Sequence, residues 1–173
     1  MIAVPAGCEL AEVAIGPGDD RHAAGRSAAA LALAPFGATL SYAGTRPIAD
    51  GVAISITHGR TRALAIAGRV ARLGIDLVDD ADAARLARIA SRFLAPERDL
   101  ATSPAACAAC FAAKEAGLKA LGLGLYDGGM FDDCAVTVLS LDPPRLAPDL
   151  ALIVGRVADG TVAIAYAPNQ CVG

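Results

Sequence analysis

An acidic residue inside an apolar segment is the first candidate for chemistry. Asp76 interrupts a mostly apolar run, residues 72–78, which predicts a buried strand. An ionised carboxylate that is buried without a partner is unfavourable, so a metal ion or another cation is expected beside Asp76. Pairing with an arginine, or capping of a neighbouring element, would explain the residue without a functional role.

A second acidic residue, Glu115, lies among lysines in an alanine-rich segment that predicts a helix. Glu115 and Lys119 are four residues apart, so on a helix they share one face, one turn apart. Such a pair is often an ordinary surface ion pair. Because the surrounding segment carries almost no other charge and Lys114 adjoins the pair, the group suggests a site for a metal-bound phosphate.

Polar side chains also gather at the end of another predicted strand, residues 52–57. Thr57 and His58 are followed by Gly59, which would let a ligand approach the backbone closely. A histidine with a purely structural role is the common alternative at such a position.

These residues are carried by elements whose order predicts a mixed α/β (α+β) fold. Helices are predicted at residues 21–36, 79–92 and about 103–121. Strands are predicted at residues 52–57, 63–67, 72–78, 134–139, 150–157 and 161–166. No long polar linker divides the chain, so a single domain is expected over residues 1–173.

The composition predicts a soluble, cytoplasmic protein. The 173 residues carry a net charge of −3, which argues against nucleic-acid binding. Apolar runs are interrupted before they could span a membrane, and the N-terminus lacks the pattern of a signal peptide. Cys107 and Cys110 form a CxxC without a second cysteine pair, so both are expected to pack as small apolar residues and not to bind zinc.

Taken in order, the three groups resemble the 4′-phosphopantetheinyl transferase superfamily. That family combines a G-[IV]-D strand motif with a downstream [FW]-x-x-K-E-[AS]-x-x-K helix. Residues 74–76 (GID) and 111–119 (FAAKEAGLK) match both motifs at every defining position. Residues 92–97 (RFLAPE) resemble the F-x-x-x-E segment that commonly precedes the helix, and residues 122–125 (GLGL) resemble the G-x-G-L that often follows it.

The upstream part resembles the longer, surfactin-synthetase-activating type of this family. Residues 25–31 (GRSAAAL) look like its G-R-x-A-A-x-x-A-L helix, and Arg46-Pro47 fits its basic residue before proline. The resemblance implies two similar sheet-plus-helix halves, about residues 1–71 and 72–173. They would be related by pseudo-twofold symmetry, with the active site at their junction. It also implies a monomer, because one chain would supply both halves.

The implied reaction moves the 4′-phosphopantetheine arm of coenzyme A to a serine of an apo acyl or peptidyl carrier protein and releases 3′,5′-ADP. Asp76 and Glu115 would hold Mg²⁺. Glu115 and Lys119 would be the catalytic residues: Glu115 accepts the proton of the serine, and Lys119, with Lys114, holds the phosphates. Further contacts with coenzyme A would come from Arg26, Arg46, Thr57 and from His58 at the 3′-phosphate.

One departure from the longer type leaves alternatives open. Its members often carry a second acid two residues after the aspartate, whereas this chain has Val78 there, as in the shorter type. A degenerate homologue that binds coenzyme A or a carrier protein without transfer is therefore an alternative. Another metal-dependent phosphate enzyme would have to use Asp76, Glu115 and Lys119 similarly, but the chain has no Walker or dinucleotide-binding glycine motif.

Overall fold

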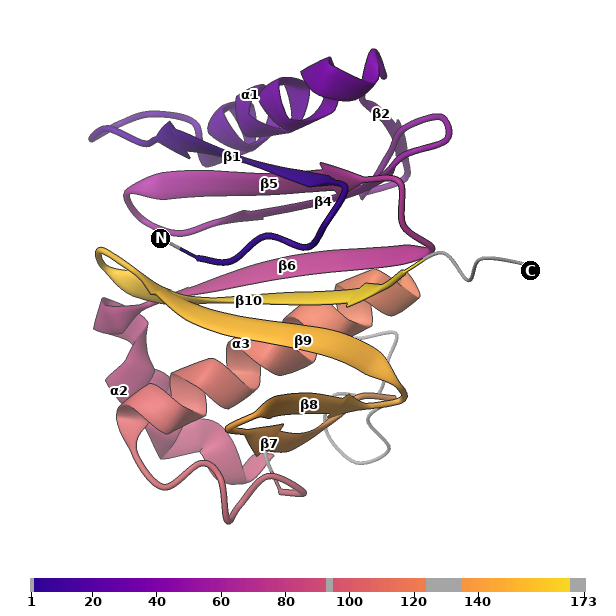
Figure 1. Ribbon diagram of the computed structural model, residues 1–173. Helices are drawn as coiled ribbons and strands as arrows, with labels where there is room; N and C mark the ends of the chain where they lie inside the picture. The colour runs from indigo at the N-terminus through magenta and orange to yellow at the C-terminus, as the bar shows by residue number, and fades with distance from the viewer. Residues whose placement is uncertain (1, 93–94, 124–134, 169–173) are drawn as a thin grey trace, which may run out of the picture.

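The chain folds as a mixed α+β protein in which two antiparallel sheets carry helices on their outer faces (Figure 1). The computed structural model describes residues 2–92, 95–123 and 135–168. The first sheet has the strand order β1-β5-β4, and the second has the order β6-β10-β9-β8-β7. A separate two-stranded hairpin, β2-β3, lies near the first sheet. The α+β class predicted from the sequence is therefore confirmed.

The first sheet contains β1 (Cys8–Ala14), β4 (Ala53–His58) and β5 (Arg62–Gly68). Its covering helix, α1 (Arg21–Leu33), begins after Asp20, whose side chain accepts a hydrogen bond from the His22 N–H and so caps the helix. The buried face of α1 is built largely from alanines, and such small side chains allow the helix to approach the sheet closely. The hairpin of β2 (Ser41–Ala43) and β3 (Arg46–Ile48) connects α1 to β4.

The second sheet is covered by two helices. Its strands are β6 (Arg72–Asp79), β7 (Thr137–Leu141), β8 (Pro144–Ala147), β9 (Leu150–Val157) and β10 (Gly160–Ala167). The helices are α2 (Asp80–Ile89) and α3 (Pro104–Leu121). Ser103 caps α3 and Pro104 opens it, while Gly122 ends it at φ 75°, a backbone conformation that favours glycine.

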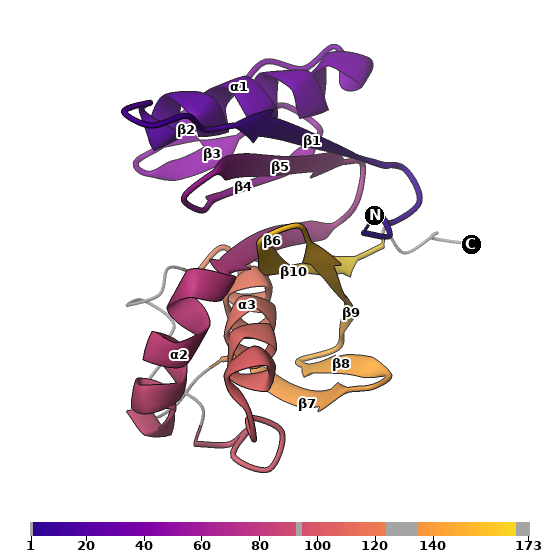
Figure 2. The same ribbon diagram turned by 90° about the vertical axis from the view of Figure 1, so that its left-hand side faces the viewer.

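The two sheets face each other across a central apolar layer, with α1 outside the first and α2 and α3 outside the second (Figure 2). Leu64 and Ile66 of β5 share this layer with Ile75 of β6 and Ile164 of β10. Strand β6 is also linked to β4 by side chains, because the Leu77 N–H donates to Thr57 Oγ1 at 3.2 Å. The junction of the sheets therefore runs along β6, the strand that carries Asp76.

Helix α3 approaches β6 closely at Gly74. A Cβ atom at this position would overlap the Ala116 carbonyl oxygen and lie 2.6 Å from the Ala120 nitrogen. Both obstacles are backbone atoms that a side-chain rotation cannot move away. The glycine of the G-I-D motif therefore sets the distance between the strand that carries Asp76 and the helix that carries Glu115.

Most elements agree with the sequence prediction. The three predicted helices and the predicted strands correspond to observed elements; the strand predicted at 134–139 begins at Thr137, and residue 134 lies outside the described residues. Strand β1, the β2-β3 hairpin and β8 were not predicted. The sheets have three and five strands, so the pseudo-twofold relation stays a prediction.

Two predictions from composition can be compared with the structure. Cys107 and Cys110 are free thiols on the buried face of α3 and pack in the core, as expected for small apolar residues. In the part of the chain that the structure describes, no helix is long and apolar enough to cross a membrane.

Candidate active site at the junction of the two sheets

Asp76 is a buried carboxylate on β6 whose partners come from both sides of the junction. Its side chain is 5% exposed, and Oδ1 accepts hydrogen bonds from Lys119 Nζ at 2.7 Å and from Thr57 Oγ1 at 3.2 Å. The lysine lies on α3 of the second sheet, whereas the threonine lies on β4 of the first. The cation expected beside the buried acid is therefore the Lys119 ammonium group.

Glu115 lies on α3 beside Asp76. Burial raises the pKa of the Glu115 carboxyl to about 8, and the negative charge of Asp76 adds to the shift. The positive charge of Lys119 opposes it, while a hydrogen bond to Asp76 favours the protonated form of Glu115. Two carboxyl groups therefore share this site with one nearby ammonium group, which is too little positive charge for both to ionise readily.

This pair of carboxyl groups fits a magnesium ion. Mg²⁺ commonly takes one or two carboxylates and completes its octahedron with waters and substrate phosphates. A divalent cation at this point would supply the positive charge whose lack raises the pKa of Glu115. Among the described residues there is no cluster of three or more His, Cys, Asp or Glu side chains that could hold a metal without such help. Asp76 and Glu115 are thus the residues that could hold it.

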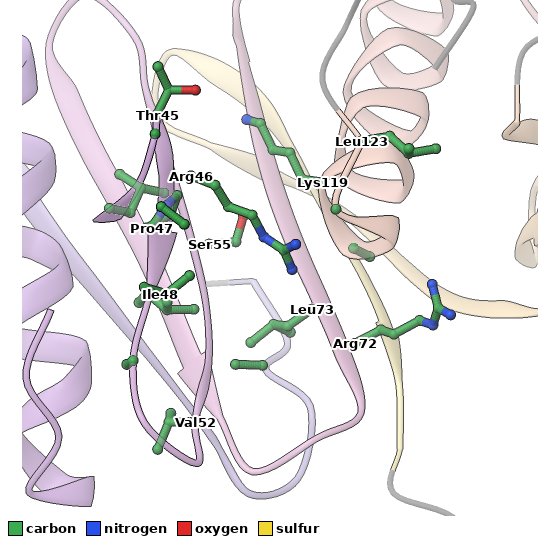
Figure 3. A pocket seen from close by; sticks show the side chains of 18 of the residues that line it. Thr45, Arg46, Pro47, Ile48, Val52, Ser55, Arg72, Leu73, Lys119 and Leu123 are labelled. Atoms are coloured by element: carbon green, nitrogen blue, oxygen red, sulfur yellow. The ribbon is translucent and has the colours of Figure 1, made fainter. Parts of the chain in front are cut away.

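A cavity of about 760 Å³ opens at the C-terminal end of α3 (Figure 3). Lys119 borders it from α3, and Arg46 borders it from the β2-β3 hairpin. The Arg46 guanidinium lies against the end of the helix, since a Cβ on Gly122 would be 2.6 Å from its Nη1. Arg72 also lines this cavity. Three cationic side chains from different elements thus border one space, a setting that suits an anionic ligand.

A second cavity, of about 620 Å³, contains His58. Arg21, Arg60 and Arg85 line it together with Asp79, Asp82 and apolar side chains that include Phe111. Asp82 pairs with Arg60 at 3.2 Å and with Arg85 at 3.5 Å, so part of this positive charge is already neutralised. The pKa of His58 is lowered by burial and by the positive charges of His22, Arg21 and Lys119. Since those cations disfavour a further positive charge, a bound anion would find favourable surroundings at His58.

Each cavity is lined by a residue of α3 that lies one turn from Glu115, although neither Asp76 nor Glu115 is itself a lining residue. The first cavity contains Lys119, which follows Glu115 by one helical turn, and the second contains Phe111, which precedes it by one turn. The structure therefore brings Asp76, Glu115 and Lys119 together. It places the predicted contacts Arg46 and His58 in different cavities.

The other predicted contacts lie farther from this group or are already engaged. Arg26 is exposed on α1 and forms a 3.7 Å ion pair with Asp20. Thr57 adjoins the site, but its hydroxyl group is used by Asp76 and by the Leu77 N–H. Lys114 is fully buried and its ammonium lies 2.9 Å from Glu97 Oε2. A phosphate contact through Lys114 would require this ion pair to open.

Neither Val78 nor Asp79 supplies the second acid that members of the longer type often carry after the aspartate. The hydrocarbon side chain of Val78 has no ligand atom; it is 6% exposed and packs in the apolar core with α3. Asp79 turns away from Asp76 toward the β4–β5 turn, where Oδ2 accepts the Arg60 N–H at 2.8 Å. Its Oδ1 is buried and has no hydrogen-bond partner among the described residues. The predicted metal site would thus have two carboxylates from the protein, those of Asp76 and Glu115.

Arg21 and Arg72 line the cavities but were not among the predicted site residues. Arg21 opens α1 and lines the cavity of His58, while Arg72 opens β6 and lines the cavity of Arg46. The only sequence signal for either residue is its position at the start of a predicted element that borders the motifs.

A known protein family matches the part of the chain that carries β6 and α3. The model of the 4′-phosphopantetheinyl transferase superfamily (ACPS) matches residues 72–166, more than half of the chain. The chain belongs to the 4′-phosphopantetheinyl transferase superfamily. The match contains the residues that meet at the site from β6 and α3, and membership implies phosphopantetheine transfer to carrier proteins, with coenzyme A as the substrate. No curated protein matches the chain.

Proposed function

We propose that this member of the 4′-phosphopantetheinyl transferase superfamily transfers the phosphopantetheine arm of coenzyme A to a serine of an acyl or peptidyl carrier protein. The observation that carries the proposal is the convergence of Asp76, Glu115 and Lys119 between a cavity with a cationic lining and a second cavity that contains His58. A diphosphate placed at this point could extend one end of coenzyme A into each cavity.

In the proposed reaction the protein positions the two substrates and stabilises the charge that develops on the phosphates. The serine oxygen would form a bond to the phosphorus next to the pantetheine arm, the bond to 3′,5′-ADP would break, and the serine proton would pass to Glu115. Mg²⁺, when bound, would neutralise the charge that develops on the departing diphosphate. No covalent enzyme intermediate is needed for this step.

Each proposed site residue has a separate task. Asp76 and Glu115 would hold the metal ion, and Lys119 would hold the phosphates as a point charge. Arg46 would contact the end of coenzyme A that occupies its cavity, and His58 would contact an anionic group in the second one. A role for Arg26 would require release from Asp20, which is an exposed pair of little energetic weight.

The upstream sheet supports assignment to the longer type. The family match begins at residue 72, yet residues 8–68 already form a sheet with its own covering helix. We propose a single domain over residues 1–173, with halves at about 1–71 and 72–173 related by pseudo-twofold symmetry. Such a chain would act as a monomer, because Thr57 and His58 of the first half already lie beside the second.

The carrier protein is proposed to dock near the second cavity. Arg60 and Arg85 line this cavity and share Asp82 as their ion-pair partner, and Arg88 follows on α2. Three arginines around Asp82 leave a net positive charge that could attract an acidic partner. The neighbouring Phe93 and Leu94 lie outside the described residues.

A transfer assay tests the proposal. Purified protein would be incubated with coenzyme A, Mg²⁺ and a panel of apo carrier proteins. The mass of each carrier would then be measured by mass spectrometry. A gain of one phosphopantetheine on a carrier, abolished in Glu115→Gln, supports the proposal. Coenzyme A binding without transfer to any carrier would instead favour the degenerate homologue, for which the buried Val78 is the motivating observation.

A further inference from the structure

A buried ion pair lies next to the catalytic face of α3, and the proposed reaction does not use it. The Lys114 ammonium group is 2.9 Å from Glu97 Oε2, and the two side chains are 1% and 0% exposed. Lys114 belongs to the same motif as Glu115 and Lys119, but it is five residues from Lys119. Five residues correspond to about 140° around a helix, so these two lysines leave α3 in different directions.

Glu97 connects three parts of the second half. Its Oε2 binds Lys114 on α3, while its Oε1 accepts the Val138 N–H of β7 at 3.0 Å. Its backbone carbonyl accepts the N–H groups of Leu100 and Ala101, both at 2.9 Å, in the turn that leads into α3. Both carboxylate oxygens are therefore engaged, and the turn, the helix and the strand are held at one point.

A second anchor holds α3 on the side that faces β6. Lys119 Nζ donates to the Ile75 carbonyl oxygen at 3.1 Å and to Asp76. Glu115 immediately follows Lys114, so its side chain leaves the helix about 100° farther round. Anchors on two faces prevent the helix from rotating about its axis. That rotation determines where the Glu115 carboxyl group lies relative to Asp76.

We propose that the Glu97–Lys114 pair positions Glu115, and that Lys114 is not a ligand of the phosphates. The inference rests on the proposed function, because it concerns how Glu115 meets magnesium and coenzyme A. Buried ion pairs can often be replaced by apolar residues of similar volume without loss of stability. The pair's specific contribution is then geometric. Its directional hydrogen bonds hold α3 at one rotation about the helix axis, whereas an apolar contact in its place would allow the helix to rotate.

Three variants test the inference, with Mg²⁺-dependent coenzyme A affinity measured by calorimetry and folding measured as the melting temperature. Glu97→Gln and Lys114→Met each remove one partner, and the double variant Glu97→Leu/Lys114→Met replaces both by apolar groups. The double variant is expected to stay folded, with a melting temperature lowered only by the Val138 N–H that loses its acceptor. Its affinity is expected to fall about 10- to 100-fold, the usual effect of disturbing a residue behind a metal ligand. Glu97→Gln is expected to lower the affinity by a similar factor.

Each contrary result has a defined meaning. If Lys114 contacted the phosphates directly, Glu97→Gln would free it and leave the affinity unchanged or higher, while Lys114→Met would lower it; this result overturns the inference. A folded double variant with the parent's affinity overturns it, and so does a double variant that cannot fold, because the pair would then serve stability. These outcomes leave the proposed function intact. A parent protein that binds no coenzyme A with Mg²⁺ overturns the proposed function, and the inference with it.

Discussion

The carboxyl groups of Glu115 and Asp76 interact electrostatically, although one residue lies on a helix and the other on a strand 39 positions earlier in the chain. Burial raises the pKa of Glu115 to about 8, with the Asp76 charge as the next cause. The protein therefore holds two carboxyl groups together in a buried position, where water screens the repulsion between their charges poorly. Such an arrangement is unfavourable for stability alone, and it suits a site that receives a cation.

The first prediction concerns the pH dependence of stability in the metal-free protein. Glu115 has an ordinary pKa of 4.5 when unfolded and about 8 when folded. Between these values the folded state keeps a proton that the unfolded state has lost, so stability falls as pH rises, by at most about 1.4 kcal/mol per pH unit from this group. Urea unfolding at several pH values would measure the slope.

The matched control for this slope is Glu115→Gln, which keeps the shape of the side chain but cannot ionise. Its unfolding free energy should fall less steeply over the same range, and the two curves should diverge in favour of the variant as pH rises. Saturating Mg²⁺ should flatten the slope of the parent because the ion favours the ionised carboxylate. Parallel curves for parent and variant would show that Glu115 ionises normally.

The second prediction concerns the cation of the site. Lys119→Met keeps the apolar stem of the side chain but removes the ammonium group that lies 2.7 Å from Asp76. Loss of a charged hydrogen bond typically costs about 1.5–3 kcal/mol, so the affinity for coenzyme A with Mg²⁺ should fall about 10- to 100-fold. Calorimetric titration would measure the change.

Lys119→Arg is the control, because it retains the charge in a broader group. It should bind coenzyme A better than Lys119→Met does. Equal affinities for the two variants would mean that charge at this position does not matter for binding, and the assignment of Lys119 to the phosphates would fail.

The third prediction concerns the contact between α3 and β6. Gly74→Ala places a methyl group against the backbone of Ala116 and Ala120, so helix and strand must separate. Overpacking of this kind typically costs about 1–3 kcal/mol. Metal-dependent coenzyme A binding should weaken too, because Asp76 and Glu115 are carried by the two separating elements. Urea unfolding and calorimetry would record both losses.

Gly25→Ala is a suitable control at a second buried glycine. Its Cβ would meet only the Ile56 Cγ2 atom at 3.1 Å, a side-chain contact that can adjust. Alanine is also favoured over glycine in a helix by about 1 kcal/mol. The unfolding free energy of Gly25→Ala should therefore change little. A decrease as large as that of Gly74→Ala would refute the role given to the close contact between α3 and β6.

The motifs predicted which residues form the site, but they did not predict which partner each side chain binds. Asp76 could be placed on a buried strand because apolar residues surround it, and Glu115 and Lys119 could be placed on one face by their spacing. The position of Lys114 depends on Glu97, which lies in an irregular turn with no periodic pattern. Local sequence carries no information about such a pairing across 17 residues, so the buried ion pair could be found only from the structure.

The β2-β3 hairpin and β8 escaped prediction for a shared physical reason, which does not apply to the seven-residue strand β1. The β2-β3 hairpin has strands of three residues, mostly exposed, and it includes Pro47. Its pattern cannot show the alternation of a half-buried strand over so few positions. β8 is four residues long and starts with Pro144. Arg46 belongs to the β2-β3 hairpin, so its position beside Gly122 could not be predicted from the sequence either.

The last prediction concerns the acid that is absent at residue 78. Val78→Glu introduces a carboxylate two residues from Asp76, on the same side of the strand. Val78 is 6% exposed within the apolar core, although it also lines the cavity of His58. Without metal, the added charge should lower the melting temperature, because it is desolvated and lies near two other acids.

Magnesium should reverse part of this loss. A third carboxylate would strengthen metal binding, and a ligand that binds only the folded state stabilises it in proportion to its occupancy. The melting temperature of Val78→Glu should therefore rise more on addition of Mg²⁺ than that of the parent. Val78→Gln is the control, because its amide has a similar shape but no charge, and it should show no larger rise than the parent. If Val78→Glu and Val78→Gln respond equally to Mg²⁺, the side chain at residue 78 does not reach the metal, and the ion does not lie between Asp76 and Glu115 as proposed.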